Sequence, residues 1–247
     1  MPELHYSEQV NHAEKYFLPY LNTNVEKFEK FNILEIGCAE AGVLDLLHKR
    51  GHSVTGLEID KNRAGMAKSK NESMNIVVGD ISSKDIVAEL NTKFDLIIMR
   101  EVIEHVSDKD STFKNLNELL KEGGYLFMSF PPKYSPFAGH QQVGKSFMKK
   151  TPYIHLLPLK ILELLSRKLQ ENVKYPAHLK TNYSTGMSIR KFEKFTKKYN
   201  WQYIVKEHFL LRPIYNLRFG TPIVKVIGLP LLREVYVLGY ETLMRKK

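Results

Sequence analysis

The chain has 247 residues, of which 43% are hydrophobic and 26% are charged, a composition typical of globular proteins rather than disordered ones. Its single cysteine, Cys38, excludes an intrachain disulfide and a cysteine-ligated metal site, and it fits a reducing compartment. The sequence has no apolar run of about 18 residues that would span a membrane, and its first residues lack the pattern of a signal peptide. We therefore expect a cytoplasmic location.

The net charge of +10 comes from one part of the chain. Residues 140–200 contain 13 lysine or arginine residues and three acidic residues, whereas positive and negative charges balance in the rest. A basic segment on a neutral body indicates an anionic partner, such as a phosphorylated substrate, an acidic glycan, a lipid headgroup or a nucleic acid. A solvated basic helix face explains the same pattern equally well.

In chain order, residues 6–30 predict a helix that places Val10, Ala13, Phe17 and Leu21 on one face. Five short apolar runs then predict buried parallel strands, at Asn32–Gly37, Ser53–Ile59, Asn75–Val78, Phe94–Met99 and Gly124–Phe130. Helical patterns fill the gaps between these runs. Strand and helix in regular alternation predict an α/β fold with a doubly wound, mostly parallel sheet and helices on both faces.

The alternation stops after Phe130. Residues 133–186 are rich in proline and basic residues, and we expect a partly helical insertion that covers an acceptor site. An amphipathic helix is predicted near 157–170. We expect one domain, 1–247, in which residues 30–132 form the cofactor-binding core.

Residues 187–247 are expected to close the domain. Ser188 is placed to cap a helix with an apolar face, and Trp201–Leu211 and Glu234–Leu243 predict two closing strands. The stretch 221–232 between them is apolar and is interrupted by Gly228.

Two acidic residues mark a nucleotide site at one edge of the sheet. The first strand ends at Gly37, where small residues let a ligand approach the backbone. Glu58 ends the second strand 23 residues after Glu35, a position suited to binding ribose hydroxyls. Asp80 follows the third strand and is placed to accept a hydrogen bond from an adenine amino group.

These segments resemble the ordered motifs of class I S-adenosylmethionine-dependent methyltransferases, over roughly residues 30–132. The resemblance rests on Glu35-Ile36-Gly37-Cys38, Gly56-Leu57-Glu58, Gly79-Asp80-Ile81, Phe94-Asp95-Leu96-Ile97-Ile98 and Glu104-His105-Val106. It implies a Rossmann-like sheet of seven strands with the last antiparallel, and S-adenosylmethionine as the cofactor.

The resemblance also implies which residues hold the cofactor. Glu35 and Gly37 would shape the methionine end, Glu58 would hold the ribose, and Asp80 and Ile81 the adenine. Further members of the implied cofactor site are Cys38, Ala39, Ile59, Arg100 and Glu101.

One departure concerns Ala39 and Ala41, where such proteins usually have glycine. Either both alanines adopt ordinary backbone angles or the site is weakened, and Gly42 is placed to supply the missing freedom. A nicotinamide dinucleotide is disfavoured, because only Gly37 and Gly42 of this turn are glycines and a pyrophosphate needs a richer cradle.

Residues after the fourth strand offer a metal site that we do not favour. Glu101, Glu104 and His105 would share one helix face. The spacing resembles the Glu-x-x-Glu-His of ubiquinone-biosynthesis O-methyltransferases, where it is interpreted as a metal site. We expect these side chains to orient the loop instead, so no metal is predicted, and His105 is kept as a candidate catalytic residue.

The loop after the fifth strand supplies the other candidate catalytic residues, His140 and Tyr134. A histidine titrates near neutral pH and suits a general base, although an ordinary loop histidine is an equally good interpretation. Amino-methylating DNA enzymes carry Pro-Pro-aromatic after strand four, where this chain has Met99-Arg100-Glu101, so adenine-N6 and cytosine-N4 chemistry is disfavoured.

We therefore predict methyl transfer to oxygen on a small-molecule, lipid-linked or glycan acceptor, which could be anionic. The amphipathic helix and the apolar stretch near the end suggest peripheral membrane contact, although both could instead pack on the domain. An RNA methyltransferase is the alternative enzyme, but no RNA-binding module is recognised and nucleic acid is disfavoured. A non-catalytic binding module is the alternative outside enzymes.

Overall fold

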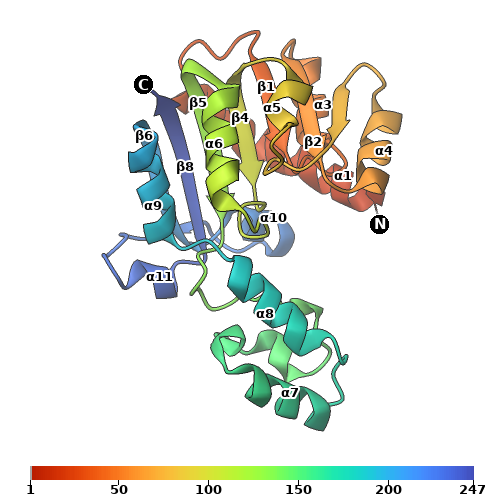
Figure 1. The fold of residues 1–247 in the computed structure, drawn as a ribbon, viewed down its shortest axis with the longest axis vertical. Helices are drawn as coiled ribbons and strands as arrows, with labels where there is room; N and C mark the ends of the chain where they lie inside the picture. Colours follow the sequence, from red (N-terminus) through yellow and green to blue (C-terminus); the bar gives the residue numbers. More distant parts are fainter. Residues whose placement is uncertain (1) are drawn as a thin grey trace.

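A computed structural model describes residues 2–247, and one mixed sheet runs through its centre (Figure 1). The strands are β1 Asn32–Ile36, β2 Ser53–Glu58, β3 Asn75–Val78, β4 Phe94–Arg100, β5 Leu120–Phe130, β6 Trp201–Leu211, β7 Val224–Lys225 and β8 Gly239–Lys246. They are ordered β3-β2-β1-β4-β5-β8-β6-β7. Strands β1 to β5 pair in parallel, and β8 is antiparallel to both β5 and β6.

The five predicted parallel strands and the first closing strand are confirmed, but the closing region differs in two respects. The sheet has eight strands rather than seven, because the two residues of β7 pair with β6 at the edge. The second closing strand was predicted from Glu234 and begins only at Gly239, since Arg233–Tyr236 form the short helix α11.

Helices cover both faces of the sheet. One face packs against α5 Ile86–Leu90, α6 Lys109–Leu119 and α9 Ile189–Lys198, and this layer holds the larger hydrophobic core. The other face packs against α1 Pro2–His12, the π-helical turn η1 Ala13–Phe17, α2 Leu18–Asn24, α3 Gly42–Lys49 and α4 Lys61–Lys70. As predicted, Ser188 caps α9 by accepting a hydrogen bond from Lys191 N.

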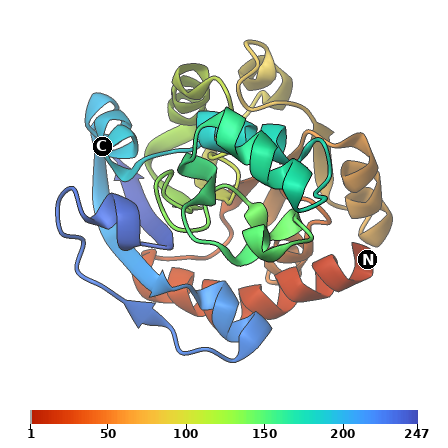
Figure 2. The same cartoon turned by 90° about the horizontal axis from the view of Figure 1, so that it is seen from below.

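Residues 141–185, after β5, form a lobe that lies below the carboxyl ends of the parallel strands (Figures 1 and 2). Its elements are the short helices η2 Gln141–Val143, η3 Phe147–Lys150 and η4 Ile154–Leu156, followed by α7 Leu159–Lys168 and α8 Tyr175–Thr185. The lobe has a small core of its own, formed by Met148, Ile154, Leu162, Tyr175 and Leu179. Its position places it over the edge where ligands bind in such sheets.

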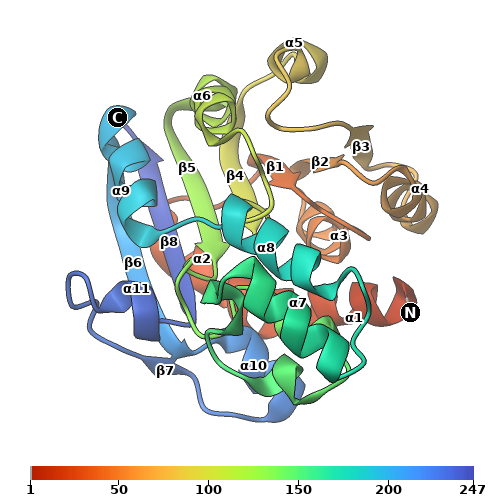
Figure 3. The same ribbon diagram turned by 60° about the horizontal axis from the view of Figure 1, so that its bottom comes forward.

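One helix near the end of the chain, α10 Pro213–Phe219, contacts the N-terminal helix. It lies beside α1 (Figure 3), and Arg218 on α10 forms an ion pair with Glu8 on α1. No helix within residues 2–247 has the length and apolar character needed to cross a membrane.

Candidate functional site

The turn after β1 adopts a left-handed backbone at three positions. The φ angles are 68° at Gly37, 54° at Ala39 and 60° at Ala41. A Cβ atom on Gly37 would lie 2.4 Å from Val102 Cγ2, so this position requires glycine. The two alanines therefore keep the shape that glycine would give, at a cost of about 1–2 kcal/mol each.

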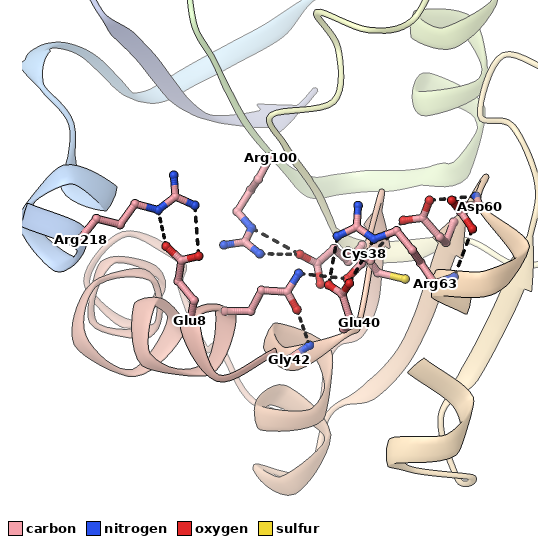
Figure 4. A network of polar contacts seen from close by, with 12 residues as sticks. Glu8, Cys38, Glu40, Gly42, Asp60, Arg63, Arg100 and Arg218 are labelled. Atoms are coloured by element: carbon pink, nitrogen blue, oxygen red, sulfur yellow. Dashed lines mark hydrogen bonds and ion pairs between the residues drawn. The ribbon is translucent and has the colours of Figure 1, made fainter. Parts of the chain in front are cut away.

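The prediction that Gly42 supplies the missing freedom is wrong. Gly42 begins α3 and has no positive φ. Its missing side chain instead makes room for α1, because a Cβ atom there would lie 2.7 Å from Tyr6 O. Gln9 on α1 accepts a hydrogen bond from Gly42 N at 2.8 Å and donates one to Cys38 O at 3.4 Å (Figure 4). The N-terminal helix thus closes over the turn.

Glu58 joins the end of β2 to this turn. Its carboxylate is buried and accepts hydrogen bonds from Ala39 N at 2.8 Å and Asp60 N at 3.0 Å. A carboxylate offers about four acceptor positions. Two backbone donors fix the orientation of Glu58 and leave acceptor positions for ribose hydroxyls.

Glu40 and Arg63 close the outer side of the turn. Arg63 on α4 donates from Nε and Nη2 to the two oxygens of Glu40, at 3.2 and 3.0 Å (Figure 4). The sequence analysis did not single out this bidentate pair, which ties α4 to the loop between β1 and α3.

Glu35 lies near the end of β1 with one oxygen paired and one free. Arg100 Nη2 donates to Oε1 at 2.8 Å, whereas the buried Oε2 has no partner within residues 2–247. Burial raises the pKa of Glu35, and Arg100 opposes that shift. A buried carboxylate oxygen without a donor is costly, and the ammonium group of the predicted cofactor would satisfy it.

The predicted adenine end has one apolar and one polar surface. Ile59 is 67% exposed although it follows a buried strand, and Asp80 is exposed and accepts from Ser82 N at 2.8 Å. Ile81 packs in the core of the sheet, so only its backbone can face a ligand. These residues fit a flat heterocycle with an amino group.

Glu101 turns away from the predicted Glu101–Glu104–His105 face. It has a φ of 55° directly after β4, forms an ion pair with Arg212, and accepts from Ser129 Oγ at 3.2 Å. Burial opposes ionisation of Glu101, but Arg212 outweighs this effect and lowers its pKa. The Oε1 atom of Glu101 is thus occupied by Arg212 and Ser129, while its charge still acts on Glu104 and His140.

The loops after β4 and β5 bring together Glu104, His105 and His140. Their ligand atoms lie within 4.8 Å of one another, and the two imidazole rings are 4.9 Å apart between centroids. Within residues 2–247 both carboxylate oxygens of Glu104, and Nε2 of His140, are buried without a hydrogen-bond partner. Burial and the nearby charge of Glu101 raise the pKa of Glu104 well above its usual value.

This cluster has two chemical uses. Two imidazoles and a carboxylate suit a divalent cation such as Zn²⁺ or Fe²⁺, and the unpartnered atoms would accept one. Without a cation, the raised pKa of Glu104 favours its protonated form beside the two imidazoles, and this form can donate or relay a proton.

The expectation that His140 titrates near neutral pH is not met. Burial, together with the neighbouring His105, lowers the pKa of His140 to about 4. The imidazole is therefore neutral at pH 7 with a free Nε2, which can accept a proton or ligate a cation. Glu101 favours the protonated form and would stabilise an imidazolium formed during a reaction.

Tyr134 lies apart from this histidine pair. It is 37% exposed and lines a separate cavity with Lys133 and Ser188, where its ring is 6.3 Å from that of Tyr183. The structure thus brings His105 and His140 together and does not place Tyr134 in contact with them.

Sequence reasoning missed a polar layer between the N-terminal helix and the sheet. His12 Nδ1 lies 3.3 Å from Arg100 Nη1, and Tyr16 donates to Glu241 Oε2 at 2.8 Å. The sequence did contain a signal for this layer: His12, Tyr16 and Tyr20 recur every four residues and therefore share one face of the expected helix.

Comparison with known proteins identifies the architecture. A family model described as a methyltransferase domain matches residues 6–206. Ubiquinone biosynthesis O-methyltransferase from Coxiella burnetii (strain RSA 493 / Nine Mile phase I) is 30% identical over 99 residues, which cover 40% of this chain and 42% of the relative. The ubiquinone biosynthesis O-methyltransferase of Chromobacterium violaceum is 29% identical over 99 residues, which cover 39% of this chain and 43% of that relative. This chain thus matches less than half the length of these relatives.

Solved structures share the fold at low identity. The plantazolicin methyltransferase BamL, in complex with a desmethylPZN analog and SAH, superposes with a TM-score of 0.62 at 12% identity, covering 99% of this chain and 89% of that one. TehB from Haemophilus influenzae superposes with a TM-score of 0.56 at 14% identity, covering 97% of this chain and 67% of TehB.

Proposed function

The chain belongs to the methyltransferase-domain family and is an S-adenosylmethionine-dependent methyltransferase, and from this premise we propose that it methylates a hydroxyl oxygen of a small-molecule acceptor. The observation that carries this proposal is the pair of neutral imidazoles, His105 and His140, at the carboxyl ends of β4 and β5. A hydroxyl must lose its proton as it attacks a methyl group, so a base beside the acceptor accelerates the reaction.

The cofactor supplies a methyl group on a positively charged sulfur, and the departing sulfur becomes a neutral thioether. Glu35 would bind its ammonium group through the free oxygen, and Glu58 would bind the ribose hydroxyls. Ile59 and Asp80 would hold the adenine, while Gly37, Cys38 and Ala39 form the floor of the turn.

His140 would take the proton of the acceptor hydroxyl at Nε2 as the oxygen–methyl bond forms. His105 lies beside it, and the carboxylate of Glu101 stabilises the positive charge that His140 gains. A neutral amine can attack the methyl group without first losing a proton, whereas a hydroxyl needs a base. The histidine pair therefore supports methylation of oxygen more directly than methylation of a neutral amine. The curated relatives are O-methyltransferases by name, which supports the same choice.

The lobe suggests that the acceptor is amphiphilic or lipid-linked. Phe147 and Leu164 are 65% and 63% exposed, and they lie within residues 140–200, where 13 lysine or arginine residues outnumber three acidic residues. Apolar side chains among basic ones are suited to contact with an anionic membrane surface. Sedimentation with vesicles that contain phosphatidylserine tests this: Phe147→Glu and Leu164→Glu should lower the bound fraction, and equal sedimentation of wild type with and without vesicles contradicts it.

Transfer of a labelled methyl group tests the acceptor class. Purified protein is incubated with methyl-labelled S-adenosylmethionine and, separately, with a lipid extract, a water-soluble metabolite extract and total RNA. We expect label in one of the first two and on an oxygen atom, as determined by mass spectrometry, with loss of label in His140→Ala. Label in RNA, or on nitrogen, contradicts the proposal and favours the nucleic-acid alternative.

A further inference from the structure

The cavity that Tyr134 lines lies where the lobe joins the sheet. It has a volume of about 190 Å³ and is bounded by the loop after β4, the start of α6, both connections to the lobe and the start of α9. Its polar lining includes three lysines and three serines, which are Lys109, Lys133, Lys191, Ser107, Ser184 and Ser188. No lining residue is acidic, and none of the three lysines forms an ion pair within residues 2–247.

Lys109 brings a fixed positive charge to this cavity. It is 4% exposed, and its Nζ donates to the carbonyl oxygens of Ile103, Val106 and Thr185 at 2.8, 2.6 and 2.5 Å. Burial, followed by the charge of Lys191, lowers the pKa of Lys109 to about 8. All three protons are used by carbonyls, so Lys109 contributes charge rather than a free donor.

Lys133 and Lys191 supply the free donors. The Nζ of Lys133 lies 4.4 Å from the centre of the Tyr183 ring, and that of Lys191 lies 6.0 Å from the centre of the Phe195 ring. Neither Nζ donates a hydrogen bond within the described chain. Burial and the charge of Lys191 lower the pKa of Lys133, which shows that the lysines repel one another.

Glu234, whose charge reaches the cavity-lining Tyr134, does not pair with the lysines in the described part of the chain. The carboxylate of Glu234 accepts hydrogen bonds from Ile189 N at 3.1 Å and from Arg190 N at 2.7 Å, so it caps the first turn of α9. The charge of Glu104 reaches Lys109 without forming an ion pair with it, and Glu104 does not line the cavity. Three like charges therefore surround one small polar cavity with hydroxyl groups between them, an arrangement that suits an anion.

We propose that this cavity binds a phosphate-type oxyanion. Lys133 and Lys191 would donate to its oxygens, with Ser107 and Ser188 as neutral donors and Lys109 as the buried charge behind them. A bound anion would connect the sheet, the lobe and α9 at one point and hold the lobe in place. The proposal stands independently of the acceptor and of the reaction at His140.

The anion is either free phosphate or the phosphate group of a larger molecule, and two probes separate these sources. Inorganic phosphate and glycerol 3-phosphate are each titrated into the whole protein by calorimetry, with chloride at matched ionic strength as the reference. Saturable binding of inorganic phosphate alone indicates a free ion, and tighter binding of glycerol 3-phosphate indicates a phosphate ester. Binding of neither contradicts the proposal.

Substitution shows whether the lysines are responsible. Lys133→Gln/Lys191→Gln should weaken the probe that binds by about tenfold or more. The matched control Lys160→Gln/Lys197→Gln removes the same charge from exposed positions on α7 and α9 and should leave binding unchanged. Single Lys191→Gln alters an exposed side chain and guards against misfolding of the double variant. Equal affinity in wild type and in both Lys191 variants would overturn the assignment, whatever their affinity for S-adenosylmethionine.

Discussion

At the scale of single residues, the site depends on carboxylates whose burial is only partly compensated. Glu35 has one oxygen on Arg100 and one without a partner, and Glu58 has both oxygens on backbone amides. Desolvating such groups costs free energy unless a ligand completes their hydrogen bonds. We therefore propose that the cofactor gains affinity by completing the hydrogen bonds of these carboxylates.

Glu58 gives the clearest affinity prediction. Charge-assisted hydrogen bonds contribute about 1.5–3 kcal/mol, so Glu58→Ala should weaken S-adenosylmethionine about tenfold or more in calorimetry. Glu58→Gln keeps one acceptor oxygen and should lose less. Glu163→Ala removes an exposed carboxylate from α7 in the lobe and serves as the control. Unchanged affinity in a folded Glu58→Ala protein would exclude this residue from the ribose site.

His140 gives the prediction for turnover. A general base contributes about 10²–10⁴-fold, so His140→Ala should lower kcat by a factor in that range while the affinity for the cofactor stays near wild type. His5→Ala changes an exposed histidine and should have no effect. Full turnover in His140→Ala would leave alignment alone as the catalytic contribution of this loop.

Chelation distinguishes the two uses of the Glu104–His105–His140 cluster. Because burial raises the pKa of Glu104 and lowers the pKa values of His105 and His140, we expect proton transfer without a cation, and activity should survive EDTA. Loss of activity that Zn²⁺, Mn²⁺ or Mg²⁺ restores would instead identify the cluster as a metal centre. Binding of the metal alone, lost in Glu104→Gln, would support that second outcome.

At the scale of elements, the N-terminal helix closes the site and carries a buried imidazole. Burial, followed by the charges of Arg100, Arg212 and Arg218, lowers the pKa of His12 to about 3. The π-helical turn Ala13–Phe17 begins directly after it, and such turns often occur at functional sites.

His12 makes the stability of the fold sensitive to acid. Below about pH 6.5 the unfolded chain takes up a proton at this histidine, whereas the folded chain does so only near pH 3. Stability that is present at neutral pH is therefore lost as the pH falls through this window. His12→Asn should make the free energy of unfolding less dependent on pH between 6.5 and 4, measured by urea denaturation, relative to His5→Asn. Parallel pH profiles in wild type and His12→Asn would contradict this.

The elements that the sequence predicted well are those with local signals. The ends of β1 to β4 and of β6 agree with the prediction to within one residue. Among them, β1, β2 and β4 are largely buried, and buried parallel strands leave little room for polar side chains. The cap at Ser188 was also local. By contrast, β7 exists only because it pairs with β6, and Arg233–Tyr236 became a helix at the end of an exposed loop, so neither had a distinctive pattern.

The site was predictable in its residues but not in its pairings. Glu35, Glu58 and Asp80 lie at the expected edge, yet the ion pair between Glu101 and Arg212 joins residues 111 positions apart and removes Glu101 from the expected cluster. His140 takes its place beside Glu104 and His105. Contacts of this range depend on how the lobe and β6 return to the sheet, which no local pattern encodes.

At the scale of the whole molecule, the sheet that carries the candidate cofactor site is joined to a basic lobe by two connections (Figure 1). The carboxyl ends of β1, β2 and β4, the helix α1 and the loop bearing His140 converge between them. We propose that this arrangement separates two tasks: the sheet would determine how the cofactor binds, and the lobe would determine which acceptor reaches it.

A crystal structure with S-adenosylhomocysteine tests the central claim most directly. We predict that its ammonium group lies within hydrogen-bond distance of Glu35 Oε2, its ribose hydroxyls on Glu58 and its adenine between Ile59 and Asp80. The sulfur atom should then face the space beside His140. Ligand density at any other edge of the sheet, or a ribose without contact to Glu58, would contradict the account.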